Sequence, residues 1–158
     1  MENLYIVLDG NNATLADNDT SLYWTIPDHY FKNMKDPQGK VNLSLVSAIF
    51  TCSTTTLFTV DTESCEILTD LQLSNSMNTN SLNTLAIVDT LTSFQSPNDI
   101  IVSLRSNLAT KLDLELSKFT SIKIQIKKQN VLCDFTAIAN TVDKSYCKFI
   151  LNLKYPKY

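Results

Sequence analysis

The chain has 158 residues, of which 44% are hydrophobic and 18% are charged, with a formal net charge of −3. It contains only two glycines, Gly10 and Gly39, where an average usage of roughly 7% would give about 11. Sites built from closely spaced glycines, such as the P-loop and the dinucleotide-binding fingerprint, are therefore excluded. Other residues must make the tight turns, and the 27 Asn and Asp residues tolerate the left-handed backbone that such turns need.

Short segments with the character of β-strands recur along the chain. They are either apolar throughout, as residues 4–8 are, or they alternate between apolar and polar positions. In chain order the predicted strands are 4–8, 21–26, 41–50, 56–60, 65–68, 84–88, 99–105, 112–116, 121–127 and 148–154. The clearest is 121–127, in which three isoleucines alternate with polar residues, and the apolar run 4–8 predicts a buried strand.

Turn-rich stretches separate these strands. They lie at 9–19, 35–39, 74–83 and 95–99. No segment shows a clean helical stripe, and no internal repeat or linker divides the chain. A length near 150 residues supports one domain, which we place at residues 1–158. The sequence therefore predicts an all-β fold, an antiparallel two-sheet sandwich or jelly roll.

The overall composition is that of a folded chain outside the membrane. There are 41 Leu, Ile and Val residues and 14 aromatics, which a disordered chain would lack. No apolar run approaches the roughly 20 residues that cross a bilayer, so we expect no membrane span. The first residues show no signal-peptide pattern, so we expect a protein that is made and retained inside a cell.

The cysteines do not form a metal-binding pattern. Cys52, Cys65, Cys133 and Cys147 include no CxxC pair, and the only histidine, His29, is distant from all four in the sequence. A zinc site would have to collect single ligands from separate places, which is unusual. Two disulfides are an alternative, but free buried thiols are favoured in the absence of a secretory signal.

No catalytic pattern emerges from the remaining polar residues. Asp9 follows an apolar strand, as in an aspartyl phosphatase, but Asn11 stands where that chemistry needs a second carboxylate. Such Asx-rich segments are ordinary turns. His29 has no nucleophile motif beside it. Tyr23 and Trp24 could stack a ligand, although aromatic residues more often serve a core or an interface. We therefore expect no enzyme activity, no catalytic residue, no bound cofactor and no metal.

Charge is distributed unevenly along the chain. Residues 1–104 carry a net charge of −9, and residues 105–158 carry a net charge of +6. One interpretation is a side of the protein that faces a polyanion. A second is head-to-tail assembly, in which an acidic flank of one copy meets a basic flank of the next. The third is that folding mixes the two halves in space and removes the asymmetry.

Six lysines define a candidate basic contact face. They are Lys118, Lys123, Lys127, Lys128, Lys148 and Lys154. If strands 121–127 and 148–154 are neighbours in a sheet, these side chains form a basic stripe on one outer face. Lysines on exposed strands also protect a sheet against aggregation, which is the alternative explanation.

Two stretches resemble a known family. The first runs from Tyr23-Trp24-Thr25-Ile26-Pro27 through the turn 35–39 to the strand 41–50, which contains Val46-Ser47-Ala48-Ile49. The second is 100–110, which ends in Arg105-Ser106-Asn107-Leu108-Ala109-Thr110. Both are similar to segments of the small single-jelly-roll capsid proteins, of penton or minor capsid type, of large double-stranded DNA viruses and of virophage or polinton-like viruses.

The resemblance implies a single jelly roll and a structural role in an icosahedral shell. It implies a vertex (penton) or minor capsid protein that contacts copies of itself, as a homo-oligomer such as a pentamer, and the major capsid protein. It places the protein in the virion, assembled inside the host cell, where the six lysines would make weak, non-specific contact with packaged nucleic acid. The alternative function is a β-sandwich interaction module, such as a phage-type connector or an adhesin-like protein or glycan binder.

Overall fold

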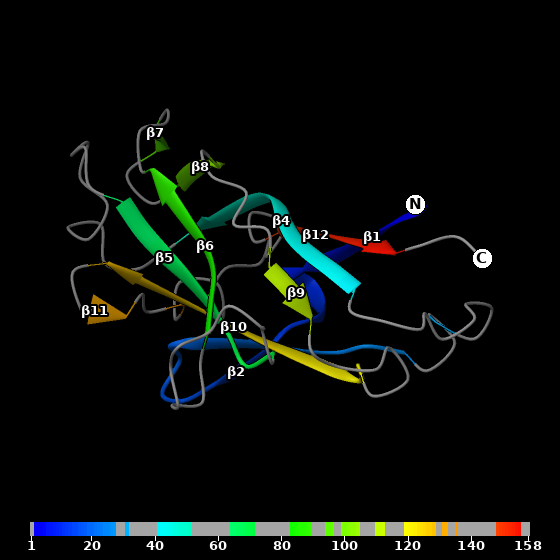
Figure 1. Cartoon of the computed structure of the whole chain (residues 1–158). Coiled ribbons are helices and arrows are strands. Elements are labelled where there is room, and N and C mark those ends of the chain that lie inside the picture. The colour runs from blue at the N-terminus through cyan, green and yellow to red at the C-terminus, as the bar shows by residue number, and fades with distance from the viewer. Residues whose placement is uncertain are drawn as a thin grey trace.

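The computed structural model describes residues 2–27, 31, 41–51, 64–71, 83–89, 94–96, 99–104, 110–112, 119–128, 131–132, 135 and 148–155. Within these residues the fold is all-β (Figure 1), with the 3-10 turn η1 (Gly10–Asn12) and no α-helix. The strands are β1 (Glu2–Asp9), β2 (Thr14–Ala16), β3 (Ser21–Thr25), β4 (Val41–Thr51), β5 (Ser64–Thr69), β6 (Asn83–Asp89), β7 (Phe94–Ser96), β8 (Asp99–Leu104), β9 (Thr110–Leu112), β10 (Ser121–Lys128), β11 (Val131–Leu132) and β12 (Lys148–Tyr155).

The strands form two antiparallel sheets. The first has the order β1-β12-β4-β8, with β9 paired to β4 and β7 paired to β8. The second has the order β6-β5-β10-β3-β2, with β11 paired to β10. Strand β8 connects them, since residues 99–102 pair with β4 and residues 103–104 pair with β6. The expectation of an all-β fold with two antiparallel sheets is confirmed.

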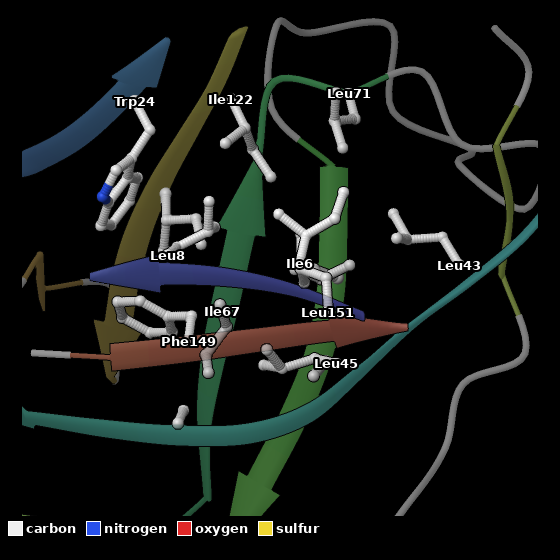
Figure 2. Close-up of a cluster of buried hydrophobic side chains, with 14 of the residues drawn as sticks. Ile6, Leu8, Trp24, Leu43, Leu45, Ile67, Leu71, Ile122, Phe149 and Leu151 are labelled. Atoms are coloured by element: carbon white, nitrogen blue, oxygen red, sulfur yellow. The ribbon is translucent and has the colours of Figure 1, made fainter. Parts of the chain in front are cut away.

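The inner faces of both sheets share one hydrophobic core. Figure 2 shows side chains of β1, β12 and β4 pointing across to those of β5 and β10, and Trp24 closes one side. The alternation along β10 explains this, because Ile122, Ile124 and Ile126 are all fully buried. The largest fully buried side chains are Phe119, Phe135, Phe149, Leu22, Leu43, Ile67, Leu85 and Ile122.

The predicted strands overlap the observed ones wherever the structure describes them. The structure adds three short strands, which are β2, β7 and β11. The segment 56–60 lies outside the described residues, and of 112–116 only Leu112 is described, at the end of β9. The predicted turn stretch 9–19 contains β2, and the stretch 95–99 contains the end of β7 and the start of β8. Strand β11 was not predicted. Strands of two or three residues are too short for alternation to be recognised in the sequence.

The turn after β2 shows how the chain manages with so few glycines. Asp17, Asn18 and Asp19 all adopt left-handed backbone, with φ angles of 53°, 56° and 65°. Asn and Asp tolerate this region better than other residues with a side chain. The expectation that these residue types replace glycine in turns is confirmed at this turn.

Candidate interaction surfaces

The six lysines of the predicted basic face do not lie on neighbouring strands. Lys118 lies outside the described residues. Lys123, Lys127 and Lys128 belong to β10, which pairs with β3, β5 and β11. Strand β12, which carries the two others, pairs with β1 and β4 in the opposite sheet. The condition for a single basic stripe is therefore not met.

Folding also mixes the acidic and basic parts of the chain. Strand β12 comes from the basic C-terminal third, yet it lies between β1 and β4, which come from the acidic part. Lys148 stands directly opposite Asp9 in the ladder of β1 and β12. Opposite charges at such positions attract each other. Strands from the two halves are thus interleaved in this sheet, and the other two interpretations remain predictions.

A polar network lies on the outer face of the second sheet, at the left-handed turn. The hydroxyl of Ser21, which is fully buried, donates to Oδ2 of Asp17 over 2.6 Å. The amide Nε2 of Gln125, also buried, donates to Oγ of Ser21 over 2.7 Å. The ammonium Nζ of Lys123 lies 2.9 Å from the same Oδ2 of Asp17. These contacts join the turn to β10 across more than 100 residues of sequence.

A second carboxylate supports the same region from β5. Oδ1 of Asp70 accepts a hydrogen bond of 2.8 Å from the backbone N–H of Lys123, just beyond the ladder of β10 and β5. Asp70 thus satisfies a donor that strand pairing leaves open. Lys123 is held through both its backbone and its side chain, so it is a structural residue and not a mobile surface lysine.

The network lowers the pKa of Asp17. The hydrogen bond from the Ser21 hydroxyl is the main cause, and the hydrogen bond and charge of Lys123 add to it, while partial burial opposes it. The unfolded chain keeps a pKa near the ordinary value of 3.8. The stabilisation by Asp17 is therefore complete well above pH 3.8, and it is lost as the pH falls through the lower pKa of the folded protein.

This predicts a pH dependence that is specific to Asp17. We expect Asp17→Asn to be less stable than the wild type at neutral pH, and we expect the difference to disappear as the solution is acidified below pH 3.8. Urea unfolding at a series of pH values, followed by the fluorescence of the single tryptophan, measures it. Asn18→Ala, in the same turn, has no titratable group and should differ from the wild type by a constant amount. A pH-independent effect of Asp17→Asn would contradict the prediction.

The other candidate residues have structural roles where they are described. Oδ1 of Asp9 accepts from the backbone N–H of Asn11 over 3.0 Å, so Asp9 caps η1, as expected of an Asx turn. Trp24 is 3% exposed, donates from Nε1 to the carbonyl oxygen of Asp9 over 2.7 Å and packs edge-on against Phe149. The core role of Trp24 is confirmed, whereas Tyr23 lies on the outer face of β3 and is half-buried.

The described residues do not test the predictions about the histidine and the cysteines. His29, Cys52, Cys133 and Cys147 lie outside the described residues, and Cys65 is placed only as a backbone position on β5. The prediction of free buried thiols therefore remains a prediction. Within the described parts of the chain, no three His, Cys, Asp or Glu side chains gather closely enough to hold a metal ion.

The outer face of β1, β12 and β4 is the surface that the sequence did not indicate. The prediction that 4–8 is a buried strand is wrong for the outer face of β1, which is the edge strand of its sheet. Tyr5 is 54% exposed and Val7 is 56% exposed, while Ile6 and Leu8 point into the core. An apolar run cannot distinguish a central strand from an edge strand that carries apolar residues on its outer face.

Comparisons of the chain with protein-family models, curated proteins and solved structures find no match. Among the residues that the structure describes, no helix is long and apolar enough to cross a membrane.

Proposed function

We propose that the chain is a non-enzymatic structural protein of a virus particle, a vertex or minor capsid protein that assembles through protein–protein contacts. In this proposal the two sheets form a single jelly roll. The order of the long strands is the observation that carries the proposal, and the sequence resemblance supports it.

Among the residues that the structure describes, eight strands have five or more residues: β1, β3, β4, β5, β6, β8, β10 and β12. In chain order, the first of these strands pairs with the eighth, which is β1 with β12. The second pairs with the seventh, which is β3 with β10. The third pairs with the sixth, which is β4 with β8, and the fourth pairs with the fifth, which is β5 with β6. Such nested pairing is what one long antiparallel hairpin produces when it is rolled into two sheets, which is the arrangement of a jelly roll with its two Greek keys.

The stretches that resemble capsid proteins lie in this framework. The first covers β3 and β4, and the second begins within β8. Strands β4 and β8 are neighbours in the first sheet, with Ala48 opposite Val102 and Ile49 opposite Ile101. The resemblance therefore concerns segments that are adjacent in space although about 50 residues separate them. The adjacency of the two stretches therefore favours a shared fold with the capsid proteins over a chance similarity of short sequences.

The alternative of a glycan-binding module draws less support from the same contacts. It depends on aromatic side chains that can stack on a sugar ring. Trp24 is in the core, and its indole N–H is bonded within the molecule, so only Tyr23 of the two candidates has access to solvent. A contact with packaged nucleic acid would have to use lysines divided between two sheets, which favours a weak and salt-sensitive interaction over a specific one.

Particle composition tests the proposed function directly. Particles purified from infected cells should contain the chain, at a fixed molar ratio to the major capsid protein, through gradient and salt washes. That ratio also distinguishes a vertex position from a position between capsomers. A chain that is abundant in infected cells but absent from the particles would contradict the proposal. A non-structural protein of similar size from the same cells is the control for carry-over.

A further inference from the structure

We infer that β1 is the edge through which two copies of this chain associate, each copy adding its β1 to the edge of the other's first sheet. The two β1 strands run antiparallel about a two-fold axis that passes beside Ile6, so the contact is isologous and both copies use the same residues. The inference goes beyond the proposed function, which does not require this contact.

The two ends of the path of described strands differ in how well they are protected. One end is β2, which has three residues, and the other is β1, which has eight. Short edge strands, bulges, prolines and lysines keep an edge from pairing with another chain. In β1 all eight residues pair with β12 without a register shift, and the strand contains neither proline nor lysine. Among the described strands β12 is its only partner, so the edge of β1 is suited to receive a further strand.

The geometry of a sheet restricts how two copies of β1 can pair. Directly opposed residues of an antiparallel pair have their side chains on the same face of the sheet. Along β1 the faces alternate, with Tyr5 and Val7 exposed on the outer face and Ile6 buried in the core. A two-fold axis that passed between two residues would oppose an outward side chain to an inward one. The axis must therefore pass beside a residue.

The sequence of β1 is nearly symmetric about Ile6, and this symmetry identifies a second β1 as the strand that fits the edge. Residues at equal distances on the two sides of Ile6 are alike in size and polarity. The matched pairs are Leu4 with Leu8, Tyr5 with Val7, and Asn3 with Asp9. A two-fold axis beside Ile6 places each residue opposite its match in the other copy. An axis beside Tyr5 would instead place the polar Asn3 opposite the apolar Val7.

Pairing about Ile6 gives the exposed side chains of β1 suitable contacts. On the outer face each Tyr5 meets Val7 of the other copy, and pairs of an aromatic with a β-branched residue stabilise a sheet. On the inner face Leu4, which is only partly buried, meets Leu8 of the other copy.

The polar ends of the paired strands are also complementary. Asn3 lies opposite Asp9 of the other copy, so an amide donor meets a carboxylate acceptor. Oδ1 of Asn3 accepts from Nδ2 of Asn152 over 3.2 Å, which leaves its amide nitrogen as the group that donates to the carboxylate. The symmetric pairing therefore opposes no two like charges within residues 3–9.

The expected association is weak and insensitive to salt. Seven paired residues extend over about 24 Å, and one pair of strands buries less than the roughly 800 Å² per partner of a standard interface. We therefore expect a dimer with a dissociation constant in the micromolar range or weaker. Backbone hydrogen bonds and apolar contacts hold it together, so added salt should not dissociate it, unlike an association between charged surfaces.

Cysteine cross-linking tests the register. Opposed residues of an antiparallel pair are close enough for a disulfide, whereas diagonal ones are too far apart. A mixture of Tyr5→Cys and Val7→Cys chains should therefore form a covalent dimer under mild oxidation. Either variant alone should form no more than the wild type, which is the control for the native cysteines. Thr25→Cys, at an exposed position of β3 in the other sheet, is the matched control and should cross-link with neither variant.

Sedimentation velocity tests the association itself. The wild-type chain should dimerise as its concentration rises, and Val7→Lys should raise the dissociation constant by about tenfold or more. A lysine on an edge strand opposes pairing, and the change occurs twice in each dimer. Ile87→Lys is the matched control, because it replaces another exposed hydrophobic residue, on β6, with the same charge and should leave the association unchanged.

Each outcome decides between the inference and its rivals. A strictly monomeric wild-type chain, or dimerisation that Val7→Lys leaves unchanged, would overturn the inference. Cross-linking of Tyr5→Cys with itself would show a different register and overturn the pairing about Ile6. A dimer that salt dissociates would indicate charged surfaces in place of the β1 edge. The proposed function is judged separately, by particle composition: a monomeric chain found in particles contradicts only the inference, and a dimeric chain absent from particles contradicts only the proposed function.

Discussion

Phe149→Ala should lower the free energy of unfolding by about 3–5 kcal/mol, the range for removing a large aromatic side chain from a core. Phe149 is fully buried near the start of β12, between β1 and β4, where Figure 2 shows it among the side chains of both sheets. Its ring lies edge-on to Trp24, with 5.9 Å between the ring centroids. Alanine would leave a cavity that the rigid strands around it cannot fill, and it would remove this aromatic contact.

Two matched variants define the effect. Ile150→Ala changes the next residue of β12, which points to the outer face and is half-buried, and it should cost far less. Phe149→Leu keeps much of the volume and should lie between the two. Urea unfolding followed by the fluorescence of Trp24, the only tryptophan, reports directly on this part of the core. Equal losses for Phe149→Ala and Ile150→Ala would show that β12 does not place Phe149 in the core and Ile150 on the outer face as described.

Ser21→Ala should cost about 1–3 kcal/mol, although it removes only one oxygen atom. The hydroxyl of Ser21 both donates to Asp17 and accepts from Gln125. Gln125 is only 6% exposed, so without Ser21 its amide N–H would stay buried and lose this partner. The loss of stability in Ser21→Ala is therefore set by the buried, unsatisfied amide of Gln125 and not by the volume removed from Ser21.

A double-mutant cycle separates this network from ordinary packing. Gln125→Leu should reduce the effect of Ser21→Ala, because the group that would be left unsatisfied is then absent. Thr25→Ala, an exposed position on the outer face of the same strand, is the control and should change stability by less than about 0.5 kcal/mol. Additive effects of Ser21→Ala and Gln125→Leu would contradict the hydrogen bond between these side chains.

Local patterns in the sequence predicted the strands well. The isoleucines of β10 and the alternating residues of β12 point into the core as their spacing indicates. The use of Asn and Asp in place of glycine is borne out in the turn 17–19. Both features depend on neighbouring residues alone, since the alternation of side chains and the tolerance of left-handed backbone are properties of a single segment.

The candidate surfaces could be predicted only in part. The six lysines were correctly placed on strands where they are described, yet they are divided between opposite sheets. The contact of Lys123 with Asp17 joins residues 106 positions apart, and no local pattern indicates it. The exposure of Tyr5 and Val7 on the outer face of β1 could not be predicted, because the apolar run 4–8 is typical of a buried strand.

The sequence by itself determined that the chain forms short, alternating β-strands joined by turns rich in Asn and Asp, because one strand and one turn contain all the information that this needs. Only the tertiary structure decided which strands are neighbours, that β1 is an edge and that β12 lies between two strands from the acidic part of the chain. The physical reason is that strands pair through backbone groups that every residue carries, so the choice of partner depends on how the whole set of apolar faces is buried together.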